Sequence, residues 1–153
     1  NYWMVVTSLE NHRITCRNDF SVQGFRESLR KRVERMEVGD RMLFYLSPEQ
    51  RFSASATVTS TFFIDHTEIW VHRSAQEVYP YRVHIEPVAL LQEEEFLDAR
   101  EIGPRMEYVK KWTPELWPLA FFGDLHLIPK KDFALIEDEM KKADSFKKAA
   151  QRR

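Results

Sequence analysis

The sequence predicts an α+β fold in which helices flank a small, curved and mostly antiparallel β-sheet. The first observation is the order of the periodic segments, which runs strand, helix, several strands and then helices. The second is residues 52–64, where apolar and hydroxyl side chains alternate as in a strand buried on one face. The small residues on its apolar face indicate a strand that bends, as in a small barrel.

Two further strands and one helix are predicted before that long strand. Residues 2–8, YWMVVTS, read as a strand because aromatic and β-branched side chains dominate them. Residues 42–47, MLFYLS, form the second strand, after a turn at Gly39. Between them, residues 25–37 are predicted to form an amphipathic helix. Its apolar face consists of Phe25, Leu29, Val33 and Met36.

The second half of the chain begins with strands. Residues 67–72, TEIWVH, read as a short strand or an extended loop. Residues 79–90 form a long strand, and Pro80 and Pro87 within it indicate an edge or a bend.

Helices are expected to dominate the C-terminal part. Glycine and proline break residues 93–118 into short helical pieces, and residues 125–128 form a brief strand. Residues 129–143 are predicted to be a helix that starts at Pro129. No linker or repeat divides the chain, so we expect a single domain over residues 1–143 and a basic tail over residues 144–153.

The composition is that of a folded chain of one domain's length. The 153 residues are 43% hydrophobic, 31% charged and 13% aromatic, with a net charge of −1, which excludes a disordered or strongly basic protein. Cys16 is the only cysteine, so a disulfide framework is excluded and a reducing, cytoplasmic setting is expected. Apolar runs are too short for a membrane span, so we expect no membrane association.

Sequence motifs for catalysis, metal binding and nucleotide binding are missing. No histidine or cysteine pair has ligand spacing, no serine lies in a nucleophile elbow, and the four glycines are too dispersed for a phosphate-binding loop. Asp124 and His126 could share a strand face as an acid–base pair, although a turn aspartate and a surface histidine explain them more simply. We expect no metal, no cofactor and no enzymatic activity.

Cations and aromatic rings remain as candidate binding groups. Residues 26–36 are strongly basic, and rings beside such a segment are what recognition of a single-stranded or flipped base requires. The rings could instead fill the core, which composition alone favours. If the basic segment contacts phosphates, the contacts are expected from Arg26, Arg30, Lys31 and Arg35.

Five segments in a fixed order carry a resemblance to a known family. They read NYWMVVTSLEN, VQGF, VGDRMLFYLS, YPYRVHIEPV and LWPLAFFGDLHLIPKKDFALIE. From about Tyr2 to Met140 the chain resembles EVE domains, which are relatives of YTH domains within the PUA-like superfamily. The resemblance implies a small, curved β pseudo-barrel flanked by helices, in agreement with the α+β prediction.

The resemblance also implies a function. PUA-like domains mostly bind RNA, YTH domains hold N6-methyladenosine in an aromatic cage, and EVE domains resemble readers of modified bases such as methylated cytosine. We therefore expect a non-catalytic domain that reads a base, expected to be modified, in RNA or DNA, as a monomer or weak dimer. The alternative is a module that binds a small molecule or nucleoside and works with an effector. An enzyme using Asp124 and His126 is a third possibility.

The pocket residues follow from the resemblance position by position. Gln23 stands where the family often carries a cage tryptophan, so Phe20 or Phe25 could supply that ring, and Gly24 would let the backbone approach the ligand. Trp117 matches a tryptophan that the family tends to keep.

Further positions are matched less directly. Pro87 falls where YTH relatives place a second cage tryptophan. Ser8 and Asn11 match polar positions of the pocket floor, although they could simply cap the next turn. Tyr45 and Ser47 match another wall, and Tyr45, like Trp117, could equally belong to the core.

Overall fold

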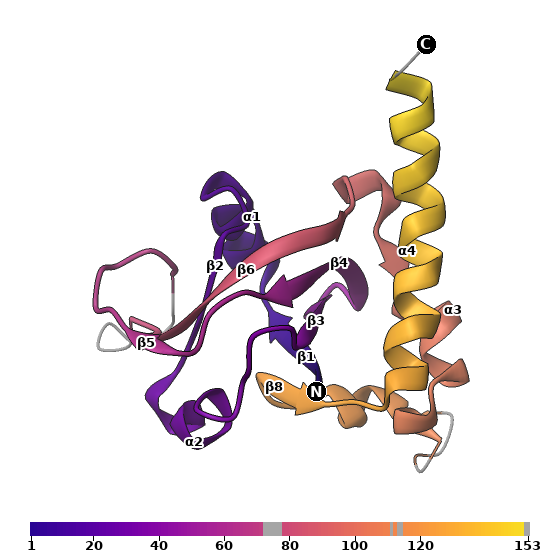
Figure 1. Ribbon diagram of the computed structural model, residues 1–153. Coiled ribbons are helices and arrows are strands. Elements are labelled where there is room, and N and C mark those ends of the chain that lie inside the picture. Colours follow the sequence, from indigo (N-terminus) through magenta and orange to yellow (C-terminus); the bar gives the residue numbers. More distant parts are fainter. Residues whose placement is uncertain (72–77, 111, 113–114, 152–153) are drawn as a thin grey trace.

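The computed structural model describes residues 1–71, 78–110, 112 and 115–151. At its centre lies a curled, mixed sheet that forms half of a barrel, with helices on its outer sides (Figure 1). Strands follow the order β2–β6–β4–β3–β1–β8, with β5 paired to β6 and β7 to β4. Their bounds are Tyr2–Thr7 for β1, Val22–Phe25 for β2, Arg41–Leu46 for β3, Arg51–Val58 for β4, Phe63–Ile64 for β5, Tyr81–Leu90 for β6, Leu97–Asp98 for β7 and Leu125–Leu127 for β8.

The α+β prediction is confirmed, and the sheet is mixed because one pair of strands is parallel. Strands β1 and β3 run parallel, and the other neighbouring strands run antiparallel. Both parallel strands are covered on their two faces: Trp3 and Val5 belong to one core cluster, and Met4 belongs to the other. This double burial explains why these segments are apolar without alternation.

Strand β4 differs from its prediction as a half-buried strand. It ends at Val58 rather than continuing to residue 64, and its serines Ser53 and Ser55 are fully buried. The hydroxyl oxygen of Ser55 accepts a hydrogen bond from the amide of Ala89 at 3.2 Å, so a polar group in this position is satisfied internally. Register shifts in the β3–β4 and β4–β6 pairs mark the irregularities that bend the sheet.

Only the middle of the helix predicted over residues 25–37 is helical, from Glu27 to Val33. Phe25 instead ends strand β2, which pairs with β6, and only a 3₁₀ turn η1 (Glu27–Leu29) and a short helix α2 (Arg30–Val33) follow. Sheet pairing overrides the helical period of the side chains here. Helix α1 (Leu9–Arg17), in contrast, was not predicted, since its buried side includes the polar residues His12 and Thr15.

The C-terminal half follows the prediction closely. The described residues between 93 and 121 form mainly short helical pieces, a brief strand β8 follows, and helix α4 (Lys130–Gln151) stands along one side of the sheet (Figure 1). The short pieces are η2 (Glu93–Glu95), α3 (Ala99–Ile102), η3 (Gly103–Arg105), η4 (Glu107–Val109) and η5 (Trp117–Phe121).

Helix α4 extends into the segment predicted as a basic tail. It continues from the expected end at residue 143 to Gln151, whereas Arg152 and Arg153 lie outside the described residues. The domain boundary itself stays a prediction. No helix among the described residues is both long and apolar enough to cross a membrane.

Candidate functional site

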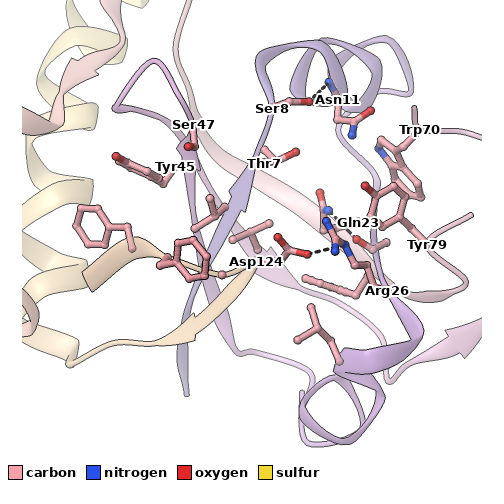
Figure 2. A pocket seen from close by; sticks show the side chains of 18 of the residues that line it. Thr7, Ser8, Asn11, Gln23, Arg26, Tyr45, Ser47, Trp70, Tyr79 and Asp124 are labelled. Carbon is pink, nitrogen blue, oxygen red and sulfur yellow. Dashed lines mark hydrogen bonds and ion pairs between the residues drawn. The ribbon is translucent and has the colours of Figure 1, made fainter. Parts of the chain in front are cut away.

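An open cavity of about 840 Å³ lies where the ends of several strands meet. Its lining comes from the end of β1 and the start of α1, from β2 and the turn after it, from the end of β3, from the segment around Trp70, and from the connection between η5 and β8 (Figure 2). The volume falls within the roughly 300–1,000 Å³ typical of pockets for small ligands or single bases. This cavity is the candidate site.

Two aromatic rings, Trp70 and Tyr79, form one wall of the cavity. They meet edge to face, with ring centroids 6.2 Å apart and an angle of 88° between the planes. The indole Nε1 of Trp70 donates a hydrogen bond to Thr15 Oγ1 at 2.9 Å, which fixes the ring against helix α1. The sequence did not predict that these two rings line a cavity. Neither residues 67–71 nor residues 78–80 form a helix or strand, so no periodic pattern indicates which way the rings point. The available signal was a tryptophan within a polar, irregular segment.

A buried arginine holds the segment that carries the two rings. Arg82 on β6 is 1% exposed, and its guanidinium donates to the carbonyl oxygens of Thr67, Val78 (3.2 Å) and Tyr79 (3.1 Å). The same guanidinium lies 5.1 Å from the centre of the Trp70 ring. Because Arg presents several donors in one plane, a single side chain ties both ends of this segment to the sheet.

Asn11 holds the segment from the other side. Its Nδ2 donates to the carbonyl oxygen of Val71 at 2.7 Å, and its Oδ1 accepts from the amide of Val71 at 2.8 Å. Ser8 caps helix α1 by accepting from the amide of Asn11 at 3.1 Å. Both predicted polar residues therefore line the cavity, as Figure 2 shows, while their observed hydrogen bonds serve the protein's own structure.

Gln23 and Gly24 line the cavity from strand β2. Gln23 is 7% exposed, and its Nε2 donates to the carbonyl oxygen of Gly24 at 2.9 Å. No described residue donates a hydrogen bond to Gln23 Oε1, which leaves an acceptor in the cavity wall. Gly24 was expected to let a ligand approach, but its close neighbour is Trp70, since a Cβ built there would lie 2.4 Å from the indole Cζ3.

Tyr45 and Ser47 lie at the end of β3, on the side of the cavity away from Trp70 (Figure 2). Tyr45 is almost entirely buried, and its ring packs against Phe121 at 4.7 Å between centroids. Burial raises the pKa of its phenol to about 12, so the hydroxyl stays neutral. Tyr45 thus serves both the core and the wall, while Ser47 is exposed at the rim.

The structure does not bring three of the predicted residues to this cavity. Phe20 is fully buried and packs on Phe44 at 4.8 Å, in the core cluster on the opposite face of the sheet from Tyr45. Trp117 is buried against Phe121. Pro87 is exposed on β6 next to the register shift, where a residue without an N–H is tolerated. None of the three lines the cavity.

Two of the four residues predicted to contact phosphates, Arg26 and Arg30, form ion pairs with carboxylates, and the other two are exposed. Arg26 lies in the cavity, where its Nε is 2.8 Å from a carboxylate oxygen of Asp124. Arg30 pairs with Glu34 at 2.8 Å. Lys31 and Arg35 are exposed on the same basic segment.

The proposed acid–base pair does not form. Asp124 pairs with Arg26, whereas His126 Nδ1 lies 2.7 Å from the hydroxyl oxygen of Tyr108. Burial lowers the pKa of His126. Among the described residues, no group of three or more histidine, cysteine, aspartate or glutamate side chains is placed to hold a metal ion.

Comparisons with known proteins identify one family by its model and a shared fold among solved structures. The model of the EVE domain family matches residues 1–138. UPF0310 protein PH1033 of Pyrococcus horikoshii is 26% identical over 147 residues, which cover 89% of this chain and 96% of that protein. Among solved structures, the Pho92 YTH domain in complex with m6A superimposes with a TM-score of 0.69 at 16% identity, over 94% of this chain and 85% of that one. The mmi1 YTH domain in complex with RNA gives a TM-score of 0.60 at 13% identity, over 93% and 85%.

Proposed function

This chain belongs to the EVE domain family, and we propose that it is a non-catalytic nucleic-acid-binding domain that receives a base in the cavity between Trp70 and Asp124. The observation that carries the proposal is the aromatic wall of Trp70 and Tyr79 facing the polar side chain of Gln23 in one cavity (Figure 2). Solved domains of the same fold are complexes with RNA and with m6A, which supports a nucleic-acid ligand.

A ring-lined cavity of this kind suits a flat base for two physical reasons. Stacking of a base on an aromatic ring is worth about 1–3 kcal/mol, and the edge of the base then needs polar partners once water has left. The side-chain oxygen Oε1 of Gln23 supplies one such partner. An added methyl group contributes only about 1 kcal/mol by burial, so reading a modified base requires close contact in the cavity rather than strong binding.

The proposed pocket joins predicted residues with residues that only the structure identified. The predicted members that line the cavity are Ser8, Asn11, Gln23, Gly24, Tyr45 and Ser47, and the structure adds Trp70 and Tyr79. We propose that Lys31 and Arg35, which are exposed beside the cavity-lining turn, make the main phosphate contacts. Arg26 and Arg30 are less suited, because each already pairs with a carboxylate.

Binding of labelled tetranucleotides at low salt, followed by fluorescence anisotropy, tests the proposal. The oligonucleotides carry cytosine, 5-methylcytosine, adenine or N6-methyladenine at one position, in DNA and in RNA. Tyr79→Leu removes a half-buried ring of the aromatic wall and is expected to weaken binding at least about tenfold, the loss of roughly 1.4 kcal/mol of stacking. Trp112→Leu removes a partly exposed ring outside the cavity and serves as the matched control.

Two results would contradict the proposal. One is the failure of every oligonucleotide to bind at low salt, and the other is equal binding by folded Tyr79→Leu and wild type. An affinity that is the same for a free nucleoside and independent of salt would instead favour the module for small molecules or nucleosides.

A further inference from the structure

Asp124 is the acidic side chain among the residues that line the cavity. Two features fix its position: its carbonyl oxygen accepts a hydrogen bond from the amide of Val6 at 2.9 Å, and the preceding Gly123 has a φ of +102°. Such a positive φ turns the chain sharply in a way that other residues rarely adopt. The carboxylate therefore projects from a defined point at the start of β8 toward the middle of the cavity, as Figure 2 shows.

Arg26, which directly follows strand β2, orients the carboxylate of Asp124 across the cavity. Its Nε lies 2.8 Å from Oδ2 of Asp124, and the two side chains approach from the end of β2 and the start of β8. The pair offsets the negative charge of Asp124, which would otherwise repel the phosphates of a nucleic acid. The Arg26 guanidinium therefore orients the carboxylate of Asp124. This pairing gives Arg26 a role inside the cavity.

Two side chains on this side of the cavity, Asp124 and Gln23, offer acceptor oxygens. A carboxylate accepts hydrogen bonds and cannot donate them, and Gln23 contributes its Oε1 while its Nε2 is engaged with Gly24. A base edge that presents N–H groups can donate hydrogen bonds to these oxygens. A keto oxygen in the same place cannot donate, so neither it nor the protein oxygens would have a hydrogen-bond partner.

We propose that Asp124, oriented by Arg26, makes the cavity select nucleobases that carry an exocyclic amino group over those with a keto oxygen at that position. This inference rests on the proposed function and names the class of base that the pocket accepts. Asp124 is the specificity-determining residue, and Arg26 is a positioning residue for it.

Matched base pairs that differ only in amino and keto groups test the inference. Tetranucleotides carry 5-methylcytosine or thymine at one position, and a second pair carries adenine or hypoxanthine. In whichever pair binds more tightly, the wild type is expected to bind the base with the amino group at least about tenfold more tightly than the base with the keto group. Asp124→Asn, which keeps the shape and adds a donor, is expected to bring the ratio to one or to invert it.

Two control variants separate orientation from charge. Glu27→Gln removes one negative charge from the neighbouring turn outside the cavity and is expected to keep the wild-type ratio. Arg26→Gln is expected to reduce the ratio without changing the salt slope of binding, whereas loss of a phosphate contact would lower that slope by about 0.7 for a single strand.

The outcomes distinguish this inference from the proposed function. Binding of both members with equal affinity to the wild type, or an unchanged ratio in Asp124→Asn, overturns the inference and leaves base binding in place. The absence of binding by every oligonucleotide overturns the proposed function, and the inference with it.

Discussion

The indole ring of Trp70 lies directly on the backbone of Gly24, and a Cβ atom added to Gly24 would lie 2.4 Å from Cζ3 of the ring and 2.8 Å from the carbonyl oxygen of Tyr79. The aromatic wall of the cavity thus depends on a glycine that precedes it by more than forty residues. The neighbouring strand β6 contributes Arg82, and helix α1 contributes Asn11, so three separate elements place one ring.

Gly24→Ala tests this contact. The added methyl group has no room unless the Trp70 segment moves, so we expect a loss of about 1–3 kcal/mol in the free energy of unfolding together with weaker base binding. Urea denaturation measures the first effect. In a double-mutant cycle with Trp70→Leu, the two changes are expected to be non-additive by at least about 0.5 kcal/mol. Additive effects would show that the two residues do not interact.

Asn11→Ala removes both hydrogen bonds to the backbone of Val71. We expect a loss of about 1 kcal/mol in the free energy of unfolding and faster hydrogen exchange at the amide of Val71, because that amide loses its acceptor. Asn18→Ala is the matched control, since it removes a side-chain hydrogen bond at the other end of helix α1. The control should leave the exchange rate at Val71 unchanged, and equal acceleration in both variants would contradict the assigned role of Asn11.

Arg82→Lys tests the hold of the buried guanidinium on the segment around Trp70. Lysine keeps a positive charge but cannot reach several carbonyl oxygens in one plane, so we expect a loss of about 2–4 kcal/mol in the free energy of unfolding. The indole N–H resonance of Trp70, which reports its hydrogen bond to Thr15, should broaden or shift. A variant with wild-type stability and an unchanged indole resonance would refute this role.

His12 should make the stability depend on pH. Burial lowers the pKa of its imidazole to about 4 from an ordinary value of 6.5, so between these pH values the unfolded chain binds a proton that the native protein does not. Stability should therefore fall as the pH drops from about 6.5 to about 4, by about 3 kcal/mol in total from this group.

Urea denaturation across that pH range measures the effect. His12→Leu should flatten this part of the profile, while the exposed control His66→Gln should leave it unchanged. An equally steep profile in His12→Leu would assign the effect to other groups.

The salt dependence of binding tests the phosphate contacts. Lys31→Gln and Arg35→Gln should each lower the slope of log affinity against log salt by about 0.7, the value for one contact to a single strand. Lys131→Gln removes an exposed cation from helix α4, and its slope should equal that of the wild type. Equal slopes in all variants would place the phosphates elsewhere.

The fold class and much of the element order follow from the amino-acid sequence alone. Local signals were sufficient for strands β1, β3 and β6, for the broken helical region after residue 93, and for helix α4, because apolar periodicity and glycine or proline breaks are properties of neighbouring residues. Family resemblance also directed attention to Gln23 and Gly24, which line the cavity.

Which rings face the cavity depends on contacts between elements that lie far apart in the chain. Phe20 and Trp117 look as suitable as Trp70 in the sequence, yet the first two are packed into the core and Trp70 forms the wall. The ring of Trp70 is placed by Gly24, Thr15 and Arg82, which are distant in sequence. Contacts of this kind leave no periodic pattern in the chain, since each depends on how separate elements come together.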